Sequence, residues 1–133
     1  MSQPVAVAVH LAVADPSAPE PCFDHERLQV YQLALELDAE LHAVLPRRGH
    51  RCLRDQLQRA SLSVVANVAE GAGRVAPPDK RRFYAIARGS ATETAALLDV
   101  LRARGVVTVE AYGQARHRLL RVVQMLSRLC REP

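Results

Sequence analysis

Tryptophan is absent from the sequence. Three tyrosines and two phenylalanines are the large aromatic residues among the 133. Leu, Ala and Val supply most of the apolar content, which favours packed helices over a sheet. No apolar run reaches the roughly 18 residues that indicate a membrane-spanning helix. The length is that of one domain with its own core, and no membrane partner is expected.

Cysteine is also scarce, and the spacing of the three cysteines excludes the common paired motifs. Cys22, Cys52 and Cys130 are far apart, with no Cys-x-x-Cys and no zinc-like cluster. We therefore expect reduced thiols, a cytoplasmic protein, and no metal or other cofactor.

Catalytic motifs are equally hard to find. The sequence has no Gly-x-Ser-x-Gly elbow, no Walker loop and no His-Glu-x-x-His. The Glu-x-x-His pairs of di-iron bundles are missing too. The chain is predicted not to be an enzyme. The opposing hypothesis would require a cleft around Glu70 and Glu93 with a strongly perturbed carboxylate.

Charge is distributed very unevenly along the chain. Residues 1–45 carry seven acids and one base, whereas residues 46–133 carry seven acids and seventeen bases, nearly all of them Arg. A basic region of this kind attracts polyanions such as RNA or DNA. A solvated surface enriched in arginine is the alternative interpretation, and composition does not separate the two.

The chain divides into an N-terminal extension, residues 1–22, and a helical domain, residues 23–133. The extension alternates Ala and Val and then contains Pro16, Pro19 and Pro21, which indicates an extended linker. A mobile tail is expected, with a short strand or a contact on another subunit as alternatives.

Apolar residues at helical spacing predict four helices in the domain. The predicted buried positions include Leu57 on the second helix, Phe83, Ile86, Leu98 and Leu101 on the third, and Leu126 on the fourth. The first should begin at Asp24 as N-cap, with Phe23 and Leu28 at the spacing of a hydrophobic staple, and end near Val44. The second should run from about Arg51 to Glu70 and end at Gly71 and Gly73, because glycine tolerates a left-handed turn.

The third and fourth helices have clear boundaries. Pro77-Pro78 suits a first turn, Gly105 should close the third helix, and Thr108 should cap the fourth, which ends near Arg131. Gly89 lies mid-helix at a cost of about 1 kcal/mol, which predicts a close helix crossing there. Short loops between four such helices predict an all-α, antiparallel, up-down-up-down four-helix bundle.

The first helix has more apolar surface than one buried face requires. Val30, Ala34, Leu37 and Leu41 form one stripe, and a second stripe lies beside it at Leu28, Tyr31 and Leu35. A surface helix normally buries about a third of its circumference. The surplus predicts contact with another subunit. A first helix deeply embedded in its own bundle is the alternative.

A set of polar residues clusters around the second and third helices. Buried charges must be paired, so Arg59 or Arg88 is expected to pair with Glu70 or Glu93 inside the bundle. Asn67 is expected to hold the interhelical corner by bonding loop backbone. The predicted structural set comprises Arg59, Asn67, Glu70, Gly71, Gly73, Arg74, Ser90 and Glu93, and loss of Glu93 is expected to destabilise the fold.

These residues also resemble a known family. Four blocks resemble the four-helix-bundle proteins encoded in intervening sequences of bacterial 23S ribosomal RNA genes. The blocks are Leu28-Gln-Val-Tyr-Gln, Gln56-Leu-x-Arg-Ala, Asn67-x-Ala-Glu-Gly-x-Gly-Arg74, and Arg82-Phe-x-x-x-Ala-Arg-Gly-Ser90 with Glu93. The resemblance covers about residues 23–130.

The resemblance implies a bacterial cytoplasmic protein without known enzymatic activity that forms a homopentameric ring. The family is similar to the accessory variability proteins of diversity-generating retroelements, which bind nucleic acid and a reverse transcriptase. RNA or DNA and a protein such as a reverse transcriptase are thus the partners to consider. The predicted nucleic-acid contacts are Arg47, Arg48, Arg51, Lys80, Arg81, Arg82, Arg118, Arg121, Arg128 and Arg131.

Overall fold

The structure, a computed structural model, describes residues 21–132, so nearly all of the predicted N-terminal extension lies outside the described residues. A 3-10 turn is followed by four α-helices, and no strand occurs in residues 21–132, which confirms the all-α class. The elements are η1 (Asp24–Arg27), α1 (Gln29–Val44), α2 (Arg51–Gly73), α3 (Pro77–Ala103) and α4 (Val109–Arg131).

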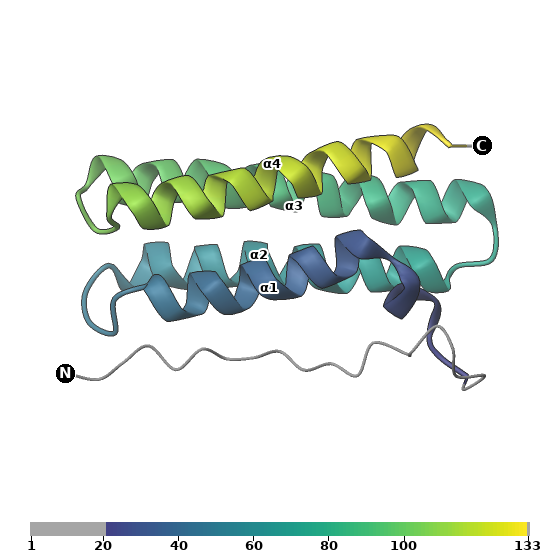
Figure 1. Ribbon diagram of the computed structural model, residues 1–133, viewed down its shortest axis with the longest axis horizontal. Coiled ribbons are helices and arrows are strands. Elements are labelled where there is room, and N and C mark those ends of the chain that lie inside the picture. The colour runs from purple at the N-terminus through teal and green to yellow at the C-terminus, as the bar shows by residue number, and fades with distance from the viewer. Residues whose placement is uncertain (1–20, 133) are drawn as a thin grey trace.

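Successive helices run antiparallel, and each packs against two neighbours in the cyclic order α1, α2, α3, α4 (Figure 1). The α1–α2 and α3–α4 loops lie at one end of the bundle, and the α2–α3 loop and the C-terminus lie at the other (Figure 1). This arrangement brings the start of α3 beside the end of α4, which decides where the basic residues gather.

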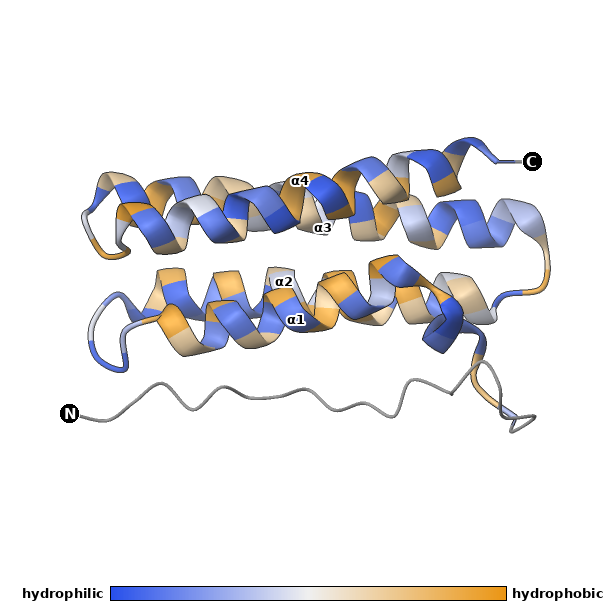
Figure 2. Cartoon of the chain, viewed as in Figure 1, coloured by the Kyte–Doolittle hydropathy of each residue, from blue (hydrophilic) through white to orange (hydrophobic). Residues whose placement is uncertain are grey.

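The core contains leucines from all four helices. Hydrophobic residues recur along each helix between hydrophilic ones, about once or twice per turn (Figure 2). Burying each such side chain contributes roughly 1.5–3 kcal/mol to stability. The core positions with at most 1 % exposure include Leu37, Leu57, Leu98, Leu101 and Leu126, all predicted from the apolar spacing.

The beginning of the first helix differs from the prediction. Residues 24–27 form a 3-10 turn, Leu28 is extended at φ −90° and ψ 122°, and α1 begins at Gln29. The side chain of Asp24 caps no helix, so the N-cap and the staple predicted there are wrong. The Glu26 carboxylate accepts the Phe23 N–H at 3.3 Å, the bond of a capping box that begins the 3-10 turn at Phe23 instead.

The end of α2 also differs, and Gly71 has another role than expected. The helix continues through Gly71 to Gly73, and neither glycine adopts a positive φ. A Cβ atom on Gly71 would lie 2.8 Å from the Tyr84 ring and 3.2 Å from the Lys80 carbonyl oxygen. Glycine is therefore required here for close packing of α2 on α3 and not for a turn.

The boundaries of α3 and α4 are as predicted. Pro77 and Pro78 occupy the first turn of α3, and Gly105 ends it at φ +70°. The Thr108 hydroxyl accepts the Ala111 N–H at 3.1 Å and caps α4.

The buried face of α3 is rotated relative to the prediction. Tyr84 is 6 % exposed and belongs to the core, whereas Ile86, which was predicted to be buried, is 44 % exposed. Gly89 faces open space, because a Cβ atom at this position would have no neighbour within 4 Å. The predicted close crossing therefore does not occur within this chain.

The second apolar stripe of α1 is half-buried, and its Leu28 and Tyr31 pack against the core. Large apolar side chains with greater exposure lie on the other helices, at Leu62, Ile86, Val100, Val109 and Leu120. These helices therefore present more apolar surface to a partner than α1 does. Within the described part of the chain, no helix combines the length and hydropathy of a membrane span.

Candidate nucleic-acid interface

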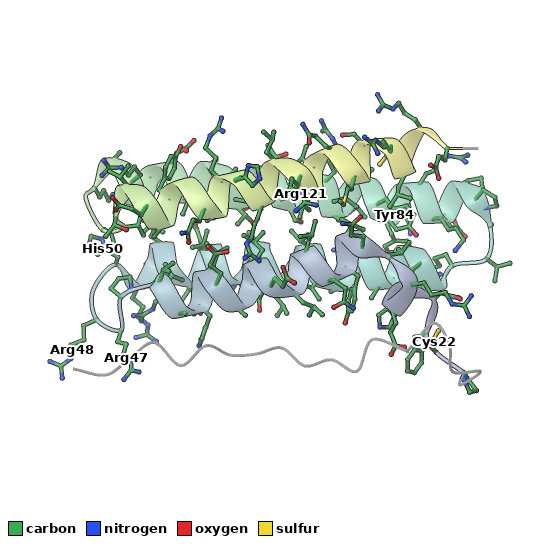
Figure 3. The ribbon with its side chains drawn as sticks, in the orientation of Figure 1. Cys22, Arg47, Arg48, His50, Tyr84 and Arg121 are labelled. Carbon is green, nitrogen blue, oxygen red and sulfur yellow. The ribbon has the colours of Figure 1, made fainter. Side chains whose placement is uncertain are left out.

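The ten basic residues predicted to contact nucleic acid do not form one surface. Arg47, Arg48 and Arg51 lie at the α1–α2 loop end of the bundle, where the first two side chains project outward (Figure 3). Lys80, Arg81 and Arg82 begin α3 at the opposite end. The four predicted contacts on α4 are distributed between its middle and its C-terminal end, at Arg118, Arg121, Arg128 and Arg131.

Arg118 lies in the middle of α4 and is engaged within the bundle. Its guanidinium group contacts the carboxylate of Glu36 at 2.8 Å and that of Glu40 at 3.0 Å, which links α4 to α1. These two acids offset its charge, so Arg118 is an interhelical contact and not a free phosphate ligand. Arg121, one turn further on, is half-buried.

The start of α3 and the end of α4 form a basic surface at the C-terminal end of the bundle. Arg81 donates to the Glu132 carbonyl oxygen at 3.3 Å, and Arg88 donates to Ser127 Oγ at 2.7 Å. We call this surface the basic end and define it by Arg74, Lys80, Arg81, Arg82, Arg88, Arg128 and Arg131. The acids near this surface are Glu70, Asp79 and Glu132, together with Asp24 of η1, whose charge also acts on Tyr84.

Two members of the basic end were not among the predicted ligands. Arg88 lies seven residues after Arg81, a spacing of two helical turns that places both on one face of α3. Arg74 follows α2 directly. Helical spacing combined with antiparallel topology could have identified Arg88, because Arg81 and Arg88 both face the end of α4.

Lys80 is directed toward the interior of this end. Its ammonium group donates to the Ala72 carbonyl oxygen at 2.7 Å and lies 3.5 Å from that of Gly71. The last carbonyl groups of an α-helix have no partner within the helix. Lys80 therefore satisfies the end of α2, a structural role that the sequence did not predict, and its charge adds to the basic end.

A stack of cationic and aromatic groups forms the corner between α2 and α3. The guanidinium carbons of Arg74 and Arg82 lie 4.7 and 4.9 Å from the centre of the Phe83 ring, the distance range of cation–π contacts. Arg74 also forms an ion pair with Glu70, one turn earlier. Two arginines are thereby held in place at the edge of the basic end.

The predicted buried pairs between the polar residues are not found. Arg59, Glu70 and Glu93 are exposed, and the ion pairs of residues 21–132 join neither Arg59 nor Arg88 to Glu70 or Glu93. The prediction failed because helical spacing alone does not show whether a residue beside a buried stripe points into the core or toward solvent.

Asn67 and Ser90 join a polar seam between α2 and α3. Asn67 Nδ2 donates to the Ser63 carbonyl oxygen at 2.8 Å, so the side chain bonds its own helix and not the corner. The hydroxyl groups of Ser63 and Ser90 lie 2.8 Å apart and connect the two helices. Gly73 is exposed beside Arg74.

Replacing Glu93 by alanine is now expected to change the free energy of unfolding of the isolated chain by less than about 0.5 kcal/mol, as is usual for an exposed side chain. Thermal unfolding of dilute protein measures this. A fall in melting temperature that grows with protein concentration would instead place Glu93 in a contact between copies.

The ionisable groups of the core are held in their neutral forms. Burial raises the pKa of the Tyr84 hydroxyl, with smaller contributions from Asp24 and Glu132. Burial likewise raises the pKa of the Cys130 thiol, although Arg88 opposes the shift. The described residues contain no group of three His, Cys, Asp or Glu side chains placed to hold a metal ion.

The fold and this surface define a small antiparallel four-helix bundle with a basic end. The family model for "23S rRNA-intervening sequence protein" matches residues 26–128. The chain therefore belongs to the 23S rRNA-intervening sequence protein family, as the resemblance in its motifs indicated.

A solved structure confirms the fold. The chain is similar to a protein of unknown function from the S23 ribosomal protein family of Bacteroides thetaiotaomicron, with a TM-score of 0.71 and 19 % sequence identity. The match covers 77 % of this chain and 99 % of that one. No curated protein matches the sequence.

Proposed function

We propose that the protein is a non-enzymatic, homo-oligomeric module of the bacterial cytoplasm that binds RNA through its basic end. One observation carries the proposal. Antiparallel packing gathers seven bases at the meeting of α2, α3 and α4, whereas the acids near them are Asp24, Glu70, Asp79 and Glu132. A local excess of positive charge raises the local concentration of polyanions and speeds their association. The family name, which refers to 23S rRNA, makes structured RNA the first ligand to test.

The geometry of the basic end supports this role. Arg81 and Arg88 are oriented by hydrogen bonds to α4, and Arg74 and Arg82 by the Phe83 ring. A guanidinium group has five N–H donors, so a single internal bond leaves others free for phosphate oxygens. Less side-chain entropy is lost when such groups bind.

RNA binding at this end should depend steeply on salt, because each neutralised phosphate releases counterions. Replacing Arg128 and Arg131 together by glutamine is expected to weaken binding. The slope of log affinity against log salt should fall in magnitude by roughly 0.7 for each phosphate of a single strand that is no longer neutralised. Fluorescence anisotropy with labelled RNA, from about 50 to 200 mM salt, measures both quantities.

The matched control is the double replacement of Arg47 and Arg48 by glutamine, which removes the same charge at the opposite end of the bundle. This variant should retain most of the affinity and most of the salt slope. Equal losses of affinity in the two variants would show that RNA binding depends on the total charge of the protein and not on the basic end. Failure of the wild-type protein to bind RNA at about 50 mM salt would overturn the proposal.

Self-association is supported by exposed apolar side chains on the outer sides of α2 and α3. Leu62, Ile86 and Val100 are 59, 44 and 37 % exposed. Gly89 leaves an open surface on the same side of α3. A homopentameric ring would repeat the basic end around one rim and multiply the contacts to one RNA molecule. Sedimentation analysis with and without RNA tests the ring, and a monomer under both conditions would exclude it.

The same exposed side chains favour a second candidate, a scaffold that docks another protein, for example a reverse transcriptase. Apolar surface of this kind is typical of protein contacts. Capture of a defined partner that persists after nuclease treatment would support the scaffold, whereas capture that requires intact nucleic acid would support RNA binding.

A further inference from the structure

We infer that the corner formed by Arg74, Arg82 and Phe83 is a stacking platform for an unpaired nucleobase, so that the protein selects single-stranded or looped RNA over duplex. This inference rests on the proposed RNA binding and names the form of RNA that the basic end takes. It concerns recognition of the base, whereas the surrounding arginines concern phosphate.

The corner is already arranged as a stack. Arg74 and Arg82 each lie within 5 Å of the centre of the same ring, and Phe83 is half-buried, so the ring is fixed by the bundle. Both guanidinium groups lie against the ring, and that of Arg74 is also partly exposed to solvent. Nucleobases stack on guanidinium planes as they do on aromatic rings.

Arg74 is the better placed of the two arginines. Its side chain is 44 % exposed, while the Glu70 carboxylate holds its guanidinium group from one side. The ion pair and the contact with Phe83 orient the group before any ligand arrives, which reduces the entropy cost of binding. A base that packs on its open surface would continue the stack outward.

The surroundings of the corner suit a nucleic-acid strand. Arg81 lies on the adjacent first turns of α3 and can contact a phosphate that flanks a stacked base. The side chain of Val75, which directly follows Arg74, is 93 % exposed and offers apolar contact at the rim. A duplex keeps its bases paired and stacked on each other, so it can use the phosphate contacts alone.

The test compares Arg74→Lys with the wild-type protein. Lysine keeps the charge for phosphate but loses the planar group that stacks. Binding is measured by fluorescence anisotropy at low salt with two probes, a single-stranded oligoadenylate and an RNA duplex of equal length. The matched control is Arg131→Lys, a change of the same type at a basic-end position outside the stack.

The wild-type protein is expected to bind the single strand more tightly than the duplex. Arg74→Lys should weaken binding of the single strand by roughly fivefold to 150-fold, the range for loss of one stacked base, and change duplex binding little. Arg131→Lys should alter both probes little. Phe83→Leu, checked for an unchanged helical circular-dichroism spectrum, should reproduce the selective loss by removing the support beneath Arg74.

Two outcomes overturn the inference while leaving RNA binding in place. One is equal affinity of the wild-type protein for single strand and duplex. The other is an Arg74→Lys variant that binds the single strand as well as the wild type does, or that loses both probes equally. Absence of binding to either probe at about 50 mM salt would instead overturn the proposed function itself.

Discussion

Replacing Leu57 by alanine is expected to lower the free energy of unfolding by about 2–5 kcal/mol, the largest effect anticipated for a single substitution in this chain. Leu57 is fully buried in the core that all four helices share. Its truncation removes apolar contacts and leaves a cavity that neighbouring helices close only in part. For a domain of this size, each kcal/mol corresponds to roughly 4 °C in melting temperature.

Leu62, on the same helix, is the matched control for this prediction because its side chain is 59 % exposed. Leu62→Ala should change stability by no more than about 0.5 kcal/mol in dilute solution. Thermal or urea unfolding, followed by circular dichroism, compares the two variants. Similar melting temperatures for both would contradict the placement of α2 in the bundle.

Replacing Gly71 by valine is expected to cost about 3 kcal/mol, at the upper end of the usual range for overpacking. The added Cβ would meet the Tyr84 ring at 2.8 Å and the Lys80 carbonyl oxygen at 3.2 Å. The backbone carbonyl cannot rotate away, and the buried Tyr84 has little room to move. Separation of α2 from α3 at this corner is therefore the expected response.

Gly73→Ala provides the control for Gly71→Val, because nothing lies within 4 Å of a Cβ atom at that position. This variant should be neutral or slightly more stable, since alanine favours the helix. Chemical denaturation gives the two free energies. A Gly71→Val protein as stable as the wild type would show that α2 and α3 are not in close contact at the corner.

The helical elements were predictable because their determinants are local. Pro77-Pro78 begins α3, Gly105 ends it with a positive φ, and Thr108 caps α4, as the sequence indicated. The order of four helices with short loops then restricts the bundle to antiparallel neighbours. The 3-10 turn before α1 was missed because Asp24 satisfies the rules for an N-cap equally well.

The orientation of each helix was less predictable than its extent. One residue corresponds to a rotation of about 100° on a helix, so neighbouring apolar residues such as Phe83, Tyr84 and Ile86 define overlapping stripes. Packing against α2 selected Tyr84 for the core, and Gly71 provides the space for its ring. The same ambiguity explains why Glu93 was predicted to lie inside the bundle, whereas it is exposed.

The sequence predicted a basic interface from its arginine content, but the position of that interface became clear only in the structure. An excess of arginine after residue 45 indicated a polyanion partner, but it did not show that Arg118 pairs with Glu36 and Glu40 or that Lys80 serves the end of α2. Those contacts join residues on different helices. Linear spacing carries no information about them.

By itself, the sequence determined the helical class, the family and most of the leucine core, because apolar period and chain-breaking residues act within a few turns. Only the tertiary structure decided which arginines lie together at the C-terminal end and why residue 71 has no side chain. The physical reason is that antiparallel packing juxtaposes positions far apart in the chain, and the resulting contacts determine which charges are engaged and which stay available.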